Sequence, residues 1–192
     1  MATSACIAPS NNIGITIDTN GTNVTVKSNS FLSNPPSQMM SEMNQQALTD
    51  IESSNSTVES VKSDMQSIAQ KYNYTVNVTI QSQFGTDQLP MPAQVSGTSM
   101  VPTLQDGQSI VVLKTKDFKI NDLVIAYYQP YNCLIVKRLT KINGNQMYLH
   151  ADNQNVEVSN VSLGNGAYET VTKTPLSTWV PKDDVIGVVK SY

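Results

Sequence analysis

The sequence predicts an α+β protein, in which a small α/β part is followed by a mainly β domain. Apolar residues recur at helical spacing only between residues 40 and 68. From residue 109 onward, short alternating segments are separated by turn residues, which is typical of a compact β domain. Residues 83–93, with one glycine and two prolines, separate the two patterns and predict a linker. We therefore expect two domains, residues 1–88 and 89–192.

Three alternating segments predict strands in the first domain. Residues 14–17 and 23–26 alternate on either side of Asn20-Gly21. Asn-Gly is favoured at the centre of a tight hairpin turn, so these two segments predict a β-hairpin. Residues 72–80 alternate again and predict a further strand.

Two helices are expected between the hairpin and that strand. Polar residues at 53–56 interrupt the helical spacing and predict a break. Ser56 and Glu59 have the spacing of a capping box at the start of the second helix. The apolar stripe includes several methionines, and we expect them to pack in the core rather than to line a binding groove.

The second domain is predicted to contain five strands. Two turns, at residues 129–132 and at Asn143-Gly144, connect the middle three as hairpins. Residues 153–180 show no regular pattern and are predicted as an irregular excursion. The expected strands are residues 109–114, 122–129, 133–142, 146–151 and 184–190.

Composition excludes some function classes. The net charge of −3 provides no basic surface for nucleic acid, and no run of 18 apolar residues is present. The low charged fraction of 14%, with many Asn, Ser and Thr, favours an extracytoplasmic protein. Cys6 and Cys133 match no metal or redox spacing. We expect structural thiols, with a disulfide as the alternative, and neither a metal nor a cofactor.

A serine in the stretch VSGTSMVPTL, residues 95–104, is the first candidate for chemistry. The Ser99 hydroxyl is a poor nucleophile unless a nearby base accepts its proton. Lys137 lies in the alternating segment 133–142, on the same strand face as Ile135 and Leu139. Burial among apolar side chains lowers the pKa of a lysine, and the neutral amine can then act as a general base. The alternative is a lysine that extends to solvent at a strand edge.

Five segments in one order carry a wider signal. They are VSGTSMVPTLQDGQSIVV (95–112), NDLVIAYYQ (121–129), CLIVKRL (133–139), HADN (150–153) and IGVV (186–189). This order resembles the serine–lysine peptidase superfamily of type I signal peptidases and the LexA- and UmuD-like self-cleaving proteins. The likeness covers roughly residues 94–190, and Ser99-Met100-X-Pro102-Thr103-Leu104 looks especially like the signal peptidase version.

The resemblance implies roles for single residues. Ser99 matches the nucleophile and Lys137 the general base, with the Ser99 N–H as the expected oxyanion donor. Arg138 and Asp152 match positions that pair structurally in signal peptidases. The residues expected around the oxyanion and the substrate cleft are Gly97, Thr98 and Met100.

Some positions depart from the resembling family. Ala151-Asp152-Asn153 stands where Gly-Asp-Asn is usual, and Asp106-Gly107-Gln108 stands where Gly-Asp precedes the strand. His150 is the only histidine and lies beside Asp152, which suggests a Ser-His-Asp triad as an alternative. Because Lys137 already fills the base position, we expect His150 to be a hydrogen-bonded histidine at a strand end.

The resemblance implies a serine endopeptidase of the signal peptidase I type. Its substrates would be secreted preproteins, cut after small residues at the extracytoplasmic face of a membrane, with an anchor that is absent from this sequence. One alternative is a self-cleaving LexA- or UmuD-like peptidase, which cuts an Ala-Gly or Cys-Gly bond upstream of the serine. The glycines before Ser99 instead follow Ile13, Asn20, Phe84 and Ser96. A second alternative is a non-catalytic binding module on the same fold.

Overall fold

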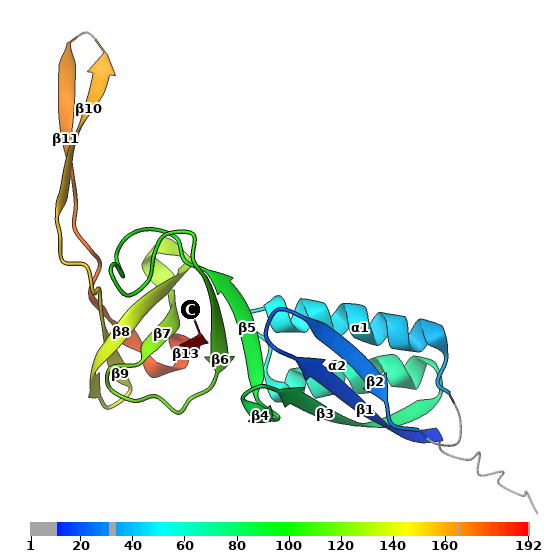
Figure 1. Cartoon of the computed structure of the whole chain (residues 1–192). Helices are drawn as coiled ribbons and strands as arrows, with labels where there is room; N and C mark the ends of the chain where they lie inside the picture. The colour runs from blue at the N-terminus through cyan, green and yellow to red at the C-terminus, as the bar shows by residue number, and fades with distance from the viewer. Residues whose placement is uncertain (1–10, 31–33, 165, 192) are drawn as a thin grey trace, which may run out of the picture. The chain divides into compact units, whose positions relative to one another are not determined.

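The computed structural model describes residues 11–30, 34–164 and 166–191 (Figure 1). The chain forms two compact units, divided between Pro92 and Ala93. The first unit contains both long helices and the second is mainly β. The α+β class predicted from the sequence is therefore confirmed.

The first unit contains a four-stranded sheet. Its strands are β1 (Asn11–Thr19), β2 (Val24–Ser28), β3 (Tyr74–Ser82) and β4 (Gly85–Thr86), in the order β2-β1-β3-β4. The antiparallel pair β1–β2 is the hairpin predicted around Asn20-Gly21. β1 and β3 run parallel, so the chain must cross over the sheet between β2 and β3.

Two helices, α1 (Ser37–Glu52) and α2 (Val58–Lys71), make this crossover and pack on one side of the sheet (Figure 1). Alternate residues of β1, among them Ile15 and Ile17, are buried in the same cluster as the apolar faces of the helices. Met43 and Met65 are fully buried there and Met40 is partly buried, so the methionine stripe is core as predicted.

The capping box at the start of α2 is one residue later than predicted. Thr57, not Ser56, is the N-cap, and its hydroxyl accepts a hydrogen bond of 3.1 Å from the Ser60 N–H. The Ser60 hydroxyl accepts one of 2.9 Å from the Thr57 N–H. Both Ser56 and Thr57 are favourable N-cap residues, so composition alone does not choose between them.

The main strands of the second unit belong to a curled seven-stranded sheet (Figure 1). The five strands predicted for this domain are confirmed, with ends that differ by at most one residue. Two 3₁₀ turns, η1 (Gln129–Tyr131) and η2 (Lys182–Asp184), connect strands that follow one another in the sequence. In sheet order the strands are β12 (Thr178–Pro181), β9 (Gln146–His150), β8 (Cys133–Asn143), β7 (Leu123–Tyr128), β13 (Val185–Ser191), β6 (Ser109–Lys114) and β5 (Leu89–Gln94).

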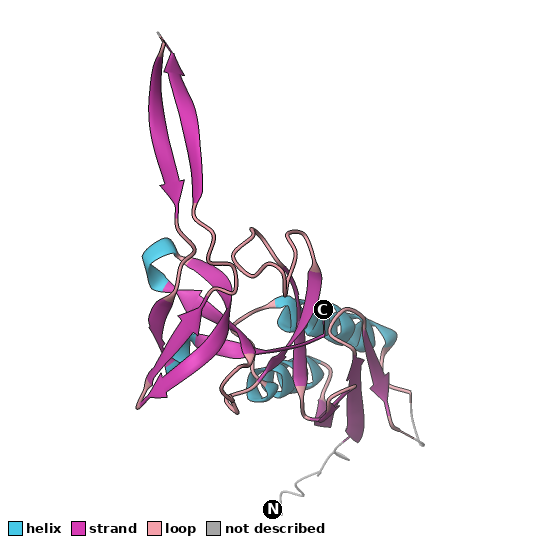
Figure 2. Ribbon diagram, turned by 60° about the vertical axis from the view of Figure 1, so that its left-hand side comes forward, coloured by secondary structure: helices cyan, strands magenta, loops and turns pink. Residues whose placement is uncertain are grey.

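Two predictions of irregular structure were wrong. The expected linker, residues 83–93, contains β4 and most of β5. The expected excursion, residues 153–180, contains β12 and the hairpin of β10 (Glu157–Gly164) and β11 (Ala167–Lys173), a separate two-stranded sheet (Figure 2). Residues 158–164 and 166–170 are exposed on both faces of this hairpin. A strand without a buried face needs no apolar alternation, so the sequence pattern did not reveal it.

Among the described residues, no helix is long and apolar enough to cross a membrane. Cys133 is exposed at the start of β8, and its possible partner Cys6 lies outside the described residues.

Candidate active site

The structure brings Ser99 and Lys137 together. The side-chain nitrogen Nζ of Lys137 forms a hydrogen bond with the Ser99 Oγ. Lys137 lies in β8, between β7 and β9, and pairs in register with Val124. Its neighbour on the same face, Leu139, is fully buried. The strand therefore holds the lysine in the sheet interior, and not at a solvent-exposed edge.

Burial determines the chemistry of Lys137. The residue is 4% exposed, and desolvation lowers its pKa from the ordinary lysine value. The negative charge of Asp152 raises the pKa and so partly opposes this effect. Because desolvation is the larger cause, Lys137 loses its proton at a lower pH than a lysine on the surface does. A neutral amine has a lone pair that can accept the Ser99 proton.

The loop that carries Ser99 is fixed at both sides. Val95, directly after β5, forms backbone hydrogen bonds with Gly107 and Gln108, each 2.9 Å long. The Gly97 N–H donates to the Asp106 carboxylate at 2.7 Å. Gly97 has a φ of +92°, a conformation that L side chains rarely adopt. Glycine at this position therefore lets the chain turn two residues before Ser99.

The buried side chain of Met100 anchors this loop to the interior of the unit. Its side chain is 1% exposed, and its carbonyl accepts a hydrogen bond of 2.9 Å from the N–H of the buried Leu104. Met100 thus belongs to the interior of the unit. Its expected role in lining a substrate cleft stays a prediction, as does that of Thr98, which is exposed beside Ser99.

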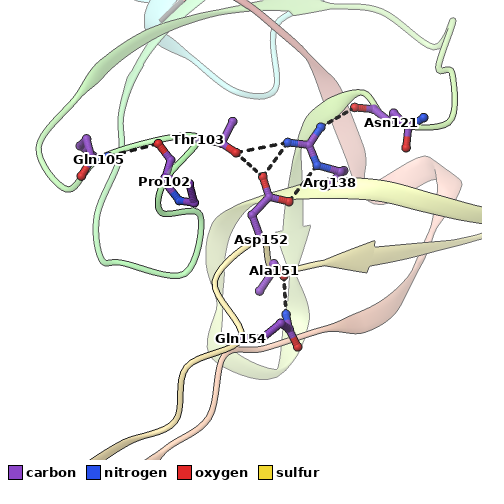
Figure 3. Close-up of polar contacts among 8 residues, drawn as sticks. All are labelled: Pro102, Thr103, Gln105, Asn121, Arg138, Ala151, Asp152 and Gln154. Carbon is purple, nitrogen blue, oxygen red and sulfur yellow. Dashed lines mark hydrogen bonds and ion pairs between the residues drawn. The ribbon is translucent and has the colours of Figure 1, made fainter.

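Arg138, which follows Lys137 in β8, forms an ion pair with Asp152 (Figure 3). The Arg138 Nε and Nη2 donate to the two carboxylate oxygens of Asp152 at 2.8 and 2.6 Å. The Thr103 hydroxyl donates to the same carboxylate at 2.6 Å, and Arg138 Nη1 donates to the Asn121 carbonyl at 2.9 Å. These contacts, first of all those from Arg138, lower the pKa of Asp152, while burial acts against them. The network ties β8 to the loop that follows Ser99.

His150 is engaged elsewhere. Its Nδ1 lies 3.3 Å from the Ser177 hydroxyl, while the Ser99 hydroxyl is bonded to Lys137. The structure therefore shows the hydrogen-bonded histidine that we expect and no Ser-His-Asp arrangement around Ser99.

One residue of this region was not identified as a site residue from the sequence. Asn153 donates hydrogen bonds to the backbone carbonyls of Thr98 and Ser99, both 3.0 Å long. The one signal in the sequence was that Asn153 directly follows Asp152, so it must lie close to the expected Arg138–Asp152 pair. The sequence could not show which groups its amide contacts.

Comparison with known proteins identifies the family. Residues 53–170, more than half of the chain, match the family described as Peptidase S24-like. The match includes Ser99, Lys137, Arg138 and Asp152. No curated protein matches the chain significantly. The fold and the matched span together show that the chain belongs to the Peptidase S24-like family of serine peptidases.

Proposed function

We propose that the chain is an endopeptidase that uses Ser99 as nucleophile and Lys137 as general base. The observation that carries this proposal is the hydrogen bond between the buried Lys137 amine nitrogen and the Ser99 hydroxyl. A binding module has no need for a desolvated lysine paired with a serine, and such burial is costly unless the amine is neutral. The lowered pKa of Lys137 is the property that a general base requires near neutral pH.

The reaction proceeds in two halves. Neutral Lys137 accepts the Ser99 proton while Oγ attacks the substrate carbonyl, and the carbonyl oxygen becomes an oxyanion. The Ser99 backbone N–H is the expected donor to this oxygen. When the C–N bond breaks, the Lys137 ammonium gives its proton to the leaving amine. A water molecule, deprotonated by Lys137, then attacks the ester and releases the acid and Ser99.

The substrate we favour is another polypeptide, a preprotein with small side chains before the cut. The Ser99-Met100-X-Pro102-Thr103-Leu104 segment supports this choice by its resemblance to signal peptidases. No glycine upstream of Ser99 in this sequence follows Ala or Cys, so the bond that self-cleaving relatives cut is not found there. A secreted substrate would place the reaction at the outer face of a membrane.

Self-cleavage is the second candidate, and the family match favours it. The S24-like fold is typical of LexA- and UmuD-like proteins, which cut their own chain. In that case the cut would lie at a bond other than Ala-Gly or Cys-Gly.

The test uses a preprotein that carries an Ala-X-Ala site, incubated in detergent with wild type, Ser99→Ala or Lys137→Ala. Mass spectrometry is applied both to the preprotein and to the enzyme chain. A single cut in the preprotein that both substitutions abolish supports the main proposal. A cut in the enzyme chain itself, at a first-order rate independent of protein concentration, supports self-cleavage. Cleavage that persists in Ser99→Ala contradicts both.

A further inference from the structure

The loop after β9 holds the backbone of the nucleophile loop at two successive carbonyls. The Asn153 side-chain Nδ2 donates to the Thr98 carbonyl at 3.0 Å. The Asn153 backbone N–H donates to the Ser99 carbonyl, also at 3.0 Å. One residue therefore contacts the peptide group on each side of the Ser99 Cα.

The side-chain amide of Asn153 has a defined orientation. Its Oδ1 accepts a hydrogen bond of 2.9 Å from the Asn155 N–H, so Nδ2 is the atom that faces Thr98. The preceding residues are fixed as well, because Asp152 is paired with Arg138 and the Ala151 N–H donates to the Ser177 hydroxyl at 3.1 Å. Asn153 is thus held in place by contacts of the residues that precede it and by the N–H of Asn155, which follows it.

These contacts determine where the Ser99 N–H points. In a planar trans peptide the C=O and N–H bonds point in opposite directions. Because Asn153 binds the Thr98 carbonyl, it fixes the plane of the Thr98–Ser99 peptide and directs the Ser99 N–H away from Asn153. The hydrogen bond also polarises this peptide, which makes the N–H a stronger donor.

We propose that Asn153 is a positioning residue for the oxyanion site: it orients and polarises the Ser99 N–H that receives the developing negative charge. This inference rests on the proposed function, since it assigns a role within the same reaction. The effect belongs to the transition state, because a donor aimed at the oxyanion stabilises the tetrahedral species more than the bound substrate.

Two substitutions remove the contact to Thr98. Asn153→Asp keeps the shape and the acceptor for Asn155, but replaces the donor Nδ2 with oxygen. Asn153→Ala removes the side-chain bonds and adds no charge. Asn155→Asp is the matched control, because it adds the same charge to the same loop at an exposed side chain.

The probe is a tripeptide boronic acid with an alanine side chain next to boron. The Ser99 oxygen adds to boron, its proton passes to Lys137, and the tetrahedral boronate carries the negative charge. Loss of one oxyanion donor lowers kcat by about 10²–10³-fold in a known protease. A misoriented Ser99 N–H is a smaller defect than a missing donor. Both Asn153 variants are therefore expected to lose about 10–100-fold in boronic acid affinity and in kcat. KM should stay within about twofold, as should all values for Asn155→Asp.

Each outcome has a separate meaning. Wild type that binds the boronic acid no better than Ser99→Ala overturns the proposed function, and this inference with it. Binding that depends on Ser99 but is unchanged in folded Asn153 variants overturns the inference alone. If neither variant folds, the amide proton of Ser99 in wild type is followed by NMR during titration with the probe. A downfield shift of this proton is expected, and an unmoved resonance overturns the inference.

Discussion

The Arg138 guanidinium and the Asp152 carboxylate meet at two points, with Nε–Oδ1 and Nη2–Oδ2 distances of 2.8 and 2.6 Å. Arg138 follows Lys137 directly in β8, but the strand geometry sends the two side chains to opposite faces. The ion pair therefore lies near the proposed base without contacting Ser99. The Arg138 charge balances that of Asp152, and this balance affects the pKa of Lys137, because the carboxylate alone would favour the protonated lysine.

Removal of Arg138 is expected to shift the pH dependence of activity. In Arg138→Ala the Asp152 charge is no longer balanced, so the pKa of Lys137 should rise. The acidic limb of the kcat/KM profile would then move to higher pH, and activity at neutral pH would fall. The double variant Arg138→Ala/Asp152→Asn removes both charges and should move this limb back to or below the wild-type position. A profile of Arg138→Ala that coincides with wild type would contradict the electrostatic role.

The same substitution is expected to destabilise the fold. The Asp152 side chain is only 12% exposed, so loss of its partner leaves a mostly buried carboxylate with fewer donors. Breaking a fully buried pair costs about 3–5 kcal/mol, and for this partly exposed pair we expect about 1–3 kcal/mol. Urea unfolding of Arg138→Ala at neutral pH measures the change.

Burial of Lys137 predicts a pH-dependent stability. Between the lowered pKa of the folded state and the ordinary value near 10.4, the unfolded lysine binds more protons than the folded one. The free energy of unfolding must therefore rise with pH through this window. Lys137→Met lacks this contribution, so the stability of wild type relative to Lys137→Met should increase as the pH is raised.

Urea unfolding of both proteins at several pH values from neutral to about 10 tests this difference. Ser99→Ala is the control, because it keeps the buried lysine and should keep the pH dependence. A stability difference that stays constant with pH would show that Lys137 titrates alike in both states.

Gly187 marks a close contact between β13 and β6. A Cβ at this position would lie 2.2 Å from the carbonyl oxygen of Leu113, and the contacted atom is backbone. Gly187→Ala is therefore expected to destabilise the second unit by about 1–3 kcal/mol or more, as for overpacked cores. Lys190→Ala, at an exposed position in the same strand, should change stability by no more than about 0.5 kcal/mol. Equal unfolding midpoints for the two variants would contradict the steric reason.

The capping box of α2 predicts a smaller effect in the first unit. Thr57→Ala removes the acceptor for the Ser60 N–H, and loss of an N-cap costs about 1 kcal/mol. The control is Gln66→Ala, an exposed position in the middle of the same helix, where alanine is a good helix former. Circular dichroism during thermal unfolding compares them, and a Thr57 variant as stable as the Gln66 variant would argue against the cap.

The sequence was most informative where one side of an element is buried. The five strands predicted for the second unit and the two helices of the first unit lie where expected. Lys137 could be identified because it shares a strand face with the apolar residues Ile135 and Leu139, and Ser99 because the surrounding segment resembles known peptidases. The mutual contact of the two residues, separated by 37 intervening positions in the printed sequence, follows only from the fold.

Other features depend on contacts that no local pattern records. Pro90 and Pro92 suggested a linker, but a strand at the edge of a sheet tolerates residues without an N–H, as β5 does. Met100 follows Ser99, and the sequence could not show that its side chain is buried, with the Leu104 N–H bound to its carbonyl. The backbone carbonyls that Asn153 binds could not be identified from side-chain types at all.

The attachment of the β10–β11 hairpin has a consequence for how this peptidase can diversify. The chain leaves the sheet after His150 and rejoins it at Thr178. Just before that point, the Ser177 hydroxyl accepts the Ala151 N–H at 3.1 Å and lies 3.3 Å from the His150 Nδ1. Both ends of the insertion are thus fastened to each other at the base of the reactive loop. Closing a longer or shorter segment between fixed ends changes the loop entropy only slowly with length. We therefore expect that the hairpin can be lengthened, trimmed or replaced while the hydrogen bond between Lys137 and Ser99 is kept.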